Sequence, residues 1–191
     1  MNWQVKNKLF LIGMVYLTHR GEMNVNGNIF ISKLETAING ITHPRFYESE
    51  RGYQGALVSE LNKILPDLEL NDAIVEQEYQ KRIEQHGIRI RPDIIIHVPF
   101  DSNNHNSRSE GNFIVIELKL GSNLTEKQAV ADYYSLALMC EHLSYPFALF
   151  IVINGGSTYF EKYSGPHKDK IKAYIINLID GVVDFRKTEN P

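Results

Sequence analysis

Residues 146–154 constrain the fold most, because they form an almost unbroken apolar run that is rich in Phe, Ile and Val. Such a run is typical of a β-strand covered on both faces, since a strand with one solvated face alternates apolar and polar residues. A doubly covered strand requires a layer of structure on each side of its sheet. The chain has 191 residues, of which 43% are hydrophobic, and this is enough for one domain with a layered core.

Three segments are predicted to be helices that supply these layers. They are residues 34–41, residues 53–65, which end before Pro66, and residues 126–142. Thr125 and Gln128 match the capping box that starts a helix. The helix at residues 53–65 carries one apolar stripe with a 3.6-residue period, made of Tyr53, Leu57, Leu61, Ile64 and Leu65.

The remaining periodic segments are predicted to be strands. They are residues 73–83, 88–99, 113–120 and 146–154, with two further strands in the tail at 171–179 and 182–186. Residues 84–87 are a plausible hairpin connection, and residues 101–112 are a polar surface loop. This order predicts an α/β fold in which helices flank a central mixed β-sheet. We expect a single domain over residues 1–191, with a core at about 50–155, an N-terminal helical extension and C-terminal strands.

The charge balance and the single cysteine exclude several classes of protein. With 23 acidic and 20 basic residues, the net charge is −3, which does not fit a histone-like, wholly basic protein. Cys140 stands alone, so the chain has no internal disulfide and no cysteine-rich zinc site, and we expect a cytoplasmic location. The apolar stretch at residues 9–17 is too short to span a membrane, and we expect it to be core.

Two predicted strands carry the residues that suggest chemistry. Glu117 and Lys119 are two positions apart, so a strand points both side chains to one face. Asp93 follows Pro92 and lies on the polar face of its own strand. Carboxylates from two adjacent strands repel each other, and Mg²⁺ relieves this repulsion because hard cations prefer oxygen ligands. A neighbouring lysine can then hold a water molecule that attacks a phosphorus atom.

The pair Pro92-Asp93, followed by Glu117-Leu118-Lys119, resembles the PD-(D/E)XK nuclease superfamily, whose members have a restriction-endonuclease-like core. The resemblance implies Asp93 and Glu117 as metal ligands, the carbonyl group of Leu118 as a further ligand, and Lys119 as the catalytic lysine. It also implies Mg²⁺ as the cofactor, with Mn²⁺ as a substitute. An acidic residue on the preceding helix is expected too, and Glu60 is the candidate, both as a metal ligand and as a catalytic residue.

Three polar residues are candidates for substrate binding. Arg89 and Arg91 share the face of Asp93 and are able to grip a phosphate backbone, since guanidinium groups match phosphate oxygens. The alternative is that they form ion pairs with Glu76 or Glu78 across the hairpin. Gln128 is able to reach a phosphate, but the capping box explains it equally well.

Other residues also have two interpretations. Glu60 either supports the metal or pairs with Lys63, and His97 is expected to be a structural histidine, because oxygen ligands suit Mg²⁺ better. A basic cluster near the C-terminus either forms a solvated face or follows a DNA groove. The cluster consists of Lys162, His167, Lys168, Lys170 and Lys172.

These observations predict a Mg²⁺-dependent nuclease that hydrolyses phosphodiester bonds, with DNA as the expected substrate. One alternative is a catalytically weak, nuclease-like module that binds nucleic acid or protein. Another is an enzyme that acts on a different phosphate ester, since the fold alone does not determine the substrate. No membrane partner is expected, and cutting both strands of a duplex with one site per chain favours a homodimer.

Overall fold

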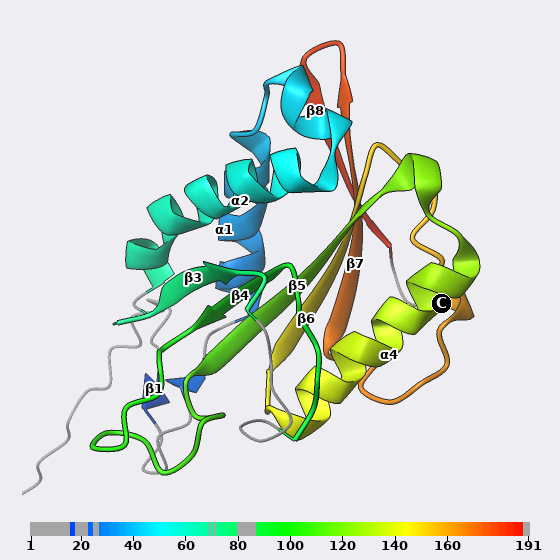
Figure 1. Cartoon of the computed structure of the whole chain (residues 1–191). Coiled ribbons are helices and arrows are strands. Elements are labelled where there is room, and N and C mark those ends of the chain that lie inside the picture. Colours follow the sequence, from blue (N-terminus) through cyan, green and yellow to red (C-terminus); the bar gives the residue numbers. More distant parts are fainter. Residues whose placement is uncertain are drawn as a thin grey trace, which may run out of the picture.

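The structure is a computed structural model, and it describes residues 16–17, 23–24, 27–68, 70, 72–79 and 87–188 (Figure 1). The short strands β1 (Tyr16–Leu17) and β2 (Met23–Asn24) form a separate antiparallel pair. Most of the stretch at residues 9–17, expected to be core, and most of the connection at residues 84–87 lie outside the described residues. Within the described part of the chain, no helix is both long enough and apolar enough to cross a membrane.

A six-stranded mixed sheet forms the centre of the fold, which confirms the predicted α/β class. Its order is β3-β4-β5-β6-β7-β8, so neighbouring strands also follow each other in the sequence. The pairs β5/β6 and β6/β7 are parallel, and the other three pairs are antiparallel. The strands are β3 (Ile74–Gln77), β4 (Ile94–His97), β5 (Asn112–Leu120), β6 (Phe147–Ile153), β7 (Ile171–Ile179) and β8 (Val182–Thr188).

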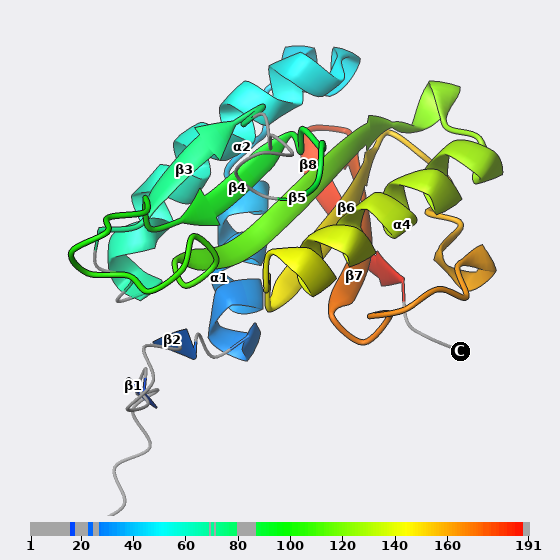
Figure 2. The same ribbon diagram turned by 60° about the horizontal axis from the view of Figure 1, so that its bottom comes forward.

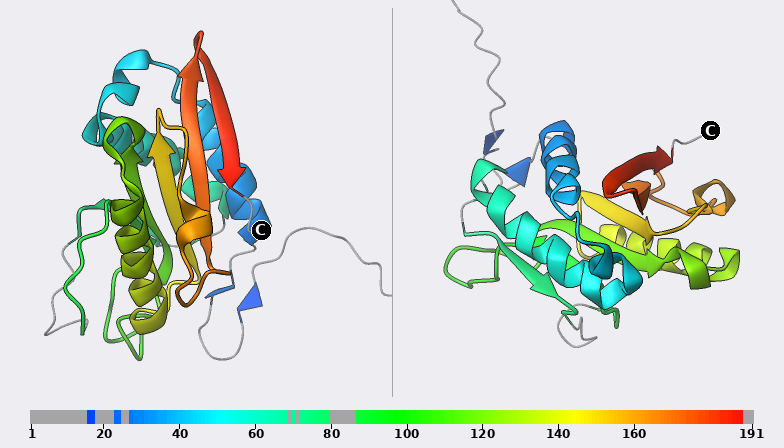
Figure 3. Two further views of the ribbon diagram at one scale, coloured as in Figure 1. Left: turned by 90° about the vertical axis from the view of Figure 1, so that its right-hand side faces the viewer. Right: turned by 90° about the horizontal axis from the view of Figure 1, so that it is seen from above.

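Helices cover both faces of the sheet, as the apolar run at residues 146–154 predicted. Helices α1 (Gly27–Asn39) and α2 (Glu50–Ile64) lie on one face, and α4 (Glu126–His142) lies on the other (Figures 2 and 3). The predicted capping box of α4 is confirmed by the contacts of Thr125 and Gln128. Short 3-10 helices occur at η1 (Pro44–Glu48), η2 (Leu65–Leu68), η3 (Gly121–Asn123) and η4 (Phe160–Lys162).

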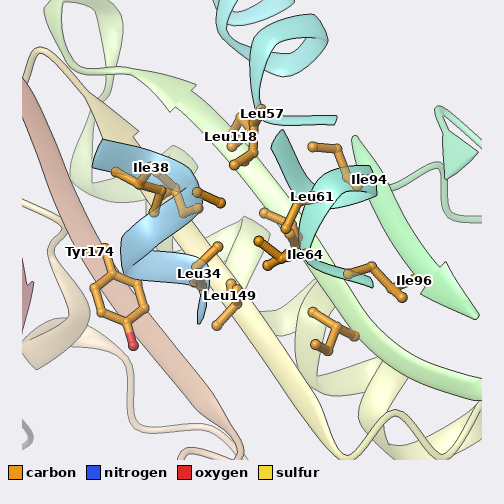
Figure 4. Packing of buried hydrophobic residues seen from close by; sticks show 14 of the residues in the cluster. Leu34, Ile38, Leu57, Leu61, Ile64, Ile94, Ile96, Leu118, Leu149 and Tyr174 are labelled. Atoms are coloured by element: carbon orange, nitrogen blue, oxygen red, sulfur yellow. The ribbon is translucent and has the colours of Figure 1, made fainter. Parts of the chain in front are cut away.

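Two hydrophobic cores result, one on each side of the sheet. Leu149 and Ile151 of β6 pack against α1 and α2, and the alternate residues Phe150 and Val152 pack against α4. The core beneath α1 and α2 is shown in Figure 4, where Leu57 lies beside Leu118. This packing determines where α2 lies over β5. It therefore also determines the position of the polar groups that α2 directs toward that strand.

The strands β3 and β4 are shorter than predicted. β4 begins only at Ile94, because Pro92 has no N–H to contribute to a ladder, although Ile88 and Ile90 still pack against the α4 core. Strict alternation along residues 113–120 predicts that Phe113 shares the face of Glu117 and Lys119, and this prediction is wrong. The register shifts between Ile96 and His97, so Phe113 is an extra residue on β5 and packs in the same core as its neighbour Ile114.

Candidate active site

Strand pairing brings the two halves of the predicted motif together. Ile94 of β4 lies opposite Ile116 of β5, so Asp93, just before β4, lies next to the Glu117-Leu118 segment. The Asp93 carboxylate oxygen Oδ2 accepts a hydrogen bond of 2.7 Å from the main-chain N–H of Leu118. This contact crosses from one strand to the next and fixes one oxygen of the carboxylate beside the Glu117 side chain.

Lys119 connects the strand to helix α4. Its Nζ donates a 2.5 Å hydrogen bond to Glu117 Oε1 and lies 3.4 Å from Asp132 Oδ2 on α4. The contact with Asp132 is a longer ion pair. Asp132 Oδ2 is buried and makes no hydrogen bond to any described residue. One ammonium group therefore lies between two half-buried carboxylates.

Helix α2 reaches the same place from the other face of the sheet. Gln54 Nε2 donates a 2.6 Å hydrogen bond to the main-chain carbonyl oxygen of Asp93, which also accepts a 2.9 Å bond from the N–H of Glu78. One turn earlier on α2, Glu50 Oε1 accepts a 2.9 Å hydrogen bond from the N–H of Leu120. The helix therefore holds the main chain on both strands that carry the motif.

The electrostatics of the group reflect an excess of carboxylates. Burial, followed by repulsion from Asp93, raises the pKa of Glu117 to about 7. Burial also raises the pKa of Asp93, although the Leu118 N–H and Lys119 oppose the shift, and it raises the pKa of Asp132. Burial lowers the pKa of Lys119, but attraction by Glu117, Asp132 and Asp93 outweighs it and the net shift is upward, so Lys119 stays protonated.

These residues fit a hard divalent cation with few protein ligands. Among the residues that the structure describes, no group of three or more His, Cys, Asp or Glu side chains is arranged to hold a metal ion by itself. Mg²⁺ needs less than that, since it commonly binds one or two carboxylates and completes its coordination with water and substrate phosphates. Asp93 and Glu117 supply two adjacent carboxylates whose pKa values are raised, first by burial, so that their charged forms are disfavoured without a cation beside them.

The structure places Glu60 away from this group. Glu60 Oε1 forms a 2.6 Å ion pair with Lys63, the alternative considered above. Ten residues of helix separate Glu60 from Glu50, which is about 15 Å along the axis at 1.5 Å per residue. The apolar stripe identifies which face of α2 meets the sheet, but the end that meets the motif is the one carrying Glu50. Glu50 is thus the acidic residue of α2 that contacts the motif strand.

The candidates for substrate binding are engaged or exposed. Arg91 Nη1 lies 3.6 Å from Glu78 Oε2, which is one of the two predicted alternatives, and Arg89 is exposed. Gln128 Oε1 accepts hydrogen bonds from the N–H and hydroxyl of Thr125, at 3.0 and 2.7 Å, and so serves the helix cap. None of these contacts points to a substrate.

The other basic residues lie elsewhere in the structure. His97 Nε2 is 2.6 Å from Glu76 Oε2 at the far end of β4, in agreement with a structural histidine. Lys168 Nζ lies over the Phe160 ring at 5.2 Å, and Lys172 Nζ donates to the carbonyl oxygen of Asp169. Lys168, in the loop before β7, and Lys172, at the start of β7, are thus held by local contacts.

Sequence reasoning missed Glu50, Gln54 and Asp132. Gln54 carried a usable signal, because it lies next to Tyr53 on the apolar stripe, and it is only 4% exposed in the structure. Asp132 also carried a signal, because it lies four positions, or about one helical turn, after the candidate Gln128 and so on the same face of its helix. Glu50 carried no such signal, since the apolar pattern that defined the helix starts at Tyr53 and Glu50 precedes it.

We compared the chain with known protein families, with curated proteins and with solved structures, and none of the three comparisons found a match.

Proposed function

We propose that the protein is a Mg²⁺-dependent nuclease that hydrolyses phosphodiester bonds in DNA, with a restriction-endonuclease-like core. The observation that supports this most strongly is the meeting of Asp93, Glu117 and Lys119 on one face of β4 and β5, with the Asp93 carboxylate bound to the N–H of Leu118 at 2.7 Å. Under this proposal, Asp93 and Glu117 hold Mg²⁺, with the Leu118 carbonyl oxygen as a further ligand and Mn²⁺ as a substitute metal.

The bound cation would supply Lewis-acid stabilisation of the negative charge that develops on the phosphate oxygens. Lys119 acts by hydrogen bonding, since its raised pKa keeps its ammonium group protonated. One of its three N–H donors is bound to Glu117, and the others can serve a water molecule or a phosphate oxygen. The oxygen of that water forms a bond to phosphorus and the water releases one proton to the solvent. The bond from phosphorus to the leaving oxygen breaks, and the leaving oxygen takes up a proton from the solvent. Asp132, whose Oδ2 lies 3.4 Å from Lys119 Nζ, would hold Lys119 in place if Glu117 bound the cation.

Glu50 and Gln54 have supporting roles in this proposal. Gln54 holds the carbonyl group of Asp93, and Glu50 holds the N–H of Leu120 and adds negative charge near Asp93. Glu50 takes the place first considered for Glu60, and because its side chain is exposed it is free to bind a metal-coordinated water.

The experiment is cleavage of supercoiled plasmid and of single-stranded DNA with Mg²⁺ or Mn²⁺. We expect Asp93→Asn, Glu117→Gln and Lys119→Ala to lower the rate by a factor of 100 or more, about what the loss of one essential catalytic group costs. Glu60→Gln is the matched control, because it removes one carboxylate of the same fold without touching the motif. Equal rates in all four variants, or no cleavage by the unmodified protein, would refute the proposal.

One observation favours the rival function, a module that binds nucleic acid or protein without cutting. The short Glu117–Lys119 ion pair neutralises the carboxylate without any metal. Calorimetric titration with Mg²⁺ separates the two functions. A nuclease binds Mg²⁺ in a manner that Asp93→Asn abolishes, whereas a docking module shows no such dependence.

A further inference from the structure

A polar pocket lies at the opposite end of β4 from Asp93. It has a volume of about 230 Å³ and lies between the sheet and the loop at residues 98–111, which is drawn in green in Figure 1. Glu76 of β3 and His97 of β4 form part of its wall, with Phe100 and Arg108 from the loop. None of these residues has a role in the proposed catalytic group.

The pocket faces the same side of the sheet as the catalytic group. Asp93, Ile95 and His97 alternate along one segment, so their side chains point the same way, and Ile95 packs in the α4 core. Four residues of strand separate Asp93 from His97, which is about 13 Å. That span equals about four stacked nucleotides of one DNA strand, at 3.4 Å each.

The size and the walls of the pocket define the ligand. Sites that enclose a drug-sized molecule have volumes of about 300–1,000 Å³, so 230 Å³ suits one planar ring system whose remaining atoms stay outside. The Arg108 guanidinium lies over the Phe100 ring at 4.8 Å, so this ring already stacks with one planar group, and a planar ligand would take that place when Arg108 turns to the rim. An exposed guanidinium at the rim is suited to a phosphate group, which it can bind through two N–H donors.

The polar wall of the pocket offers directional hydrogen bonding. Glu76 Oε2 and His97 Nε2 are 2.6 Å apart, so the second carboxylate oxygen of Glu76 can accept a hydrogen bond from an N–H group of a ligand. The buried Asn112 donates from Nδ2 to the carbonyl oxygen of Leu143 at 2.8 Å, and this bond fixes the orientation of its amide in the wall. A nucleotide combines a planar base, hydrogen-bond donors on the edge of that base and a phosphate group on its sugar.

We infer that this pocket binds one unpaired base of the DNA strand, with Phe100 stacking on the base and Arg108 bound to its phosphate. The inference rests on the proposed nuclease function and adds a substrate feature to it: a strand that is single-stranded on one side of the cut. Stacking on an aromatic ring is tolerant of sequence, because every base has a π-face, so all four bases are accepted.

The direct test is to titrate small phosphate-bearing probes into the metal-free protein in EDTA. Binding is monitored by the NMR signals of the Asn112 side-chain amide and the Arg108 Nε–H. The probes are the four deoxynucleoside monophosphates, deoxyribose 5-phosphate and inorganic phosphate. We expect the mononucleotides to shift both signals and the two base-free probes to shift neither signal at the same concentration. Phe100→Ala should weaken mononucleotide binding about tenfold or more. Phe46→Ala, which removes a phenylalanine of similar exposure (39% against 38%), should leave it unchanged.

Two results would overturn the inference. If deoxyribose 5-phosphate binds as well as the mononucleotides, the site is an anion contact of Arg108 alone, and if Phe100→Ala binds all probes normally, no base stacks there. The titration needs neither metal nor cleavage, so it is independent of the proposed function. A protein that cuts DNA but binds no mononucleotide refutes only the pocket, and one that binds mononucleotides but cuts nothing refutes only the nuclease.

Discussion

Gln54 is the side chain that joins the core under α2 to Asp93, the first residue of the proposed catalytic group. It is 4% exposed, and its Nε2 donates a 2.6 Å hydrogen bond to the carbonyl oxygen of Asp93. Gln54→Met keeps the length of the side chain and removes the donor. The carbonyl oxygen retains its 2.9 Å bond from the N–H of Glu78, so the loss is that of one hydrogen bond and not of all solvation. This corresponds to about 0.5–1.5 kcal/mol of unfolding free energy.

A stability change of this size lowers the melting temperature by about 2–4 °C for each kcal/mol in a chain of this length. We expect a second, distinct effect on metal binding, because the Asp93 main chain loses one of the two bonds to its carbonyl group. Loss of such an outer contact to a metal ligand lowers affinity about tenfold or more. The assays are thermal melting in EDTA and calorimetric titration with Mg²⁺.

The matched control is Asn62→Met on the same helix. Asn62 Nδ2 donates only to the carbonyl oxygen of Val58, one turn back, so this variant removes a local hydrogen bond without reaching a strand. It should bind Mg²⁺ like the unmodified protein. If Gln54→Met melts at a lower temperature but binds Mg²⁺ normally, Gln54 serves packing alone, and the positioning of Asp93 by α2 is refuted.

Three further outcomes follow from the structure. The pKa of Glu117 is about 7 in the folded protein against an ordinary value of 4.5, so the native state holds its proton to higher pH than the unfolded state does. The metal-free protein should therefore lose up to about 3 kcal/mol of unfolding free energy between pH 5 and pH 8. Urea unfolding of Glu117→Gln should show a weaker dependence of this free energy on pH, and an unchanged dependence contradicts the prediction. Cys140 is 2% exposed with a pKa of about 11, so a thiol reagent at pH 8 should label it only after unfolding, and rapid labelling of the native protein contradicts its burial. Gly121→Ala should lower the unfolding free energy by about 1–3 kcal/mol, because the new Cβ would lie 2.3 Å from Gly155 Cα. Gly55→Ala, in open space on α2, should raise the unfolding free energy by about 0.5–1 kcal/mol, and equal denaturation midpoints of the two variants would refute this.

Sequence periodicity predicted most of the fold because the chain is locally consistent. The helix at residues 126–142 matches α4 to the residue, since Thr125 and Gln128 define its start by a contact that is local in sequence. The run at residues 146–154 matches β6 and its two-sided burial. The strand predicted at residues 88–99 is longer than β4, because the alternation of apolar and polar residues continues through Pro92. Periodicity contains no information on the ladder hydrogen bond that proline removes.

The site was predictable only where it lies on strands. Asp93, Glu117 and Lys119 share a face by the two-residue period, and adjacent antiparallel strands then place them together. The contribution of α2 was not predictable in this way. Helical periodicity predicts which face of a helix is buried. The choice between Glu50 and Glu60 depends instead on which end of α2 crosses β5. The crossing point is decided by packing between residues far apart in the sequence, such as Leu57 on Leu118.

The same geometry changes the meaning of the net charge of −3. Asp93, Glu117 and Asp132 surround a single lysine, and Glu50 adds to the repulsion, so the site itself repels a phosphate backbone until a cation binds. At pH 8 in EDTA, the double variant Asp93→Asn/Glu117→Gln should therefore bind DNA more tightly than the unmodified protein. A charge at 4 Å contributes about 1 kcal/mol in water, so the gain should be at least severalfold. Fluorescence anisotropy at low salt measures it, with Glu60→Gln as the control that removes a charge elsewhere. If the double variant binds DNA no better than this control, the phosphate backbone does not pass over Asp93 and Glu117.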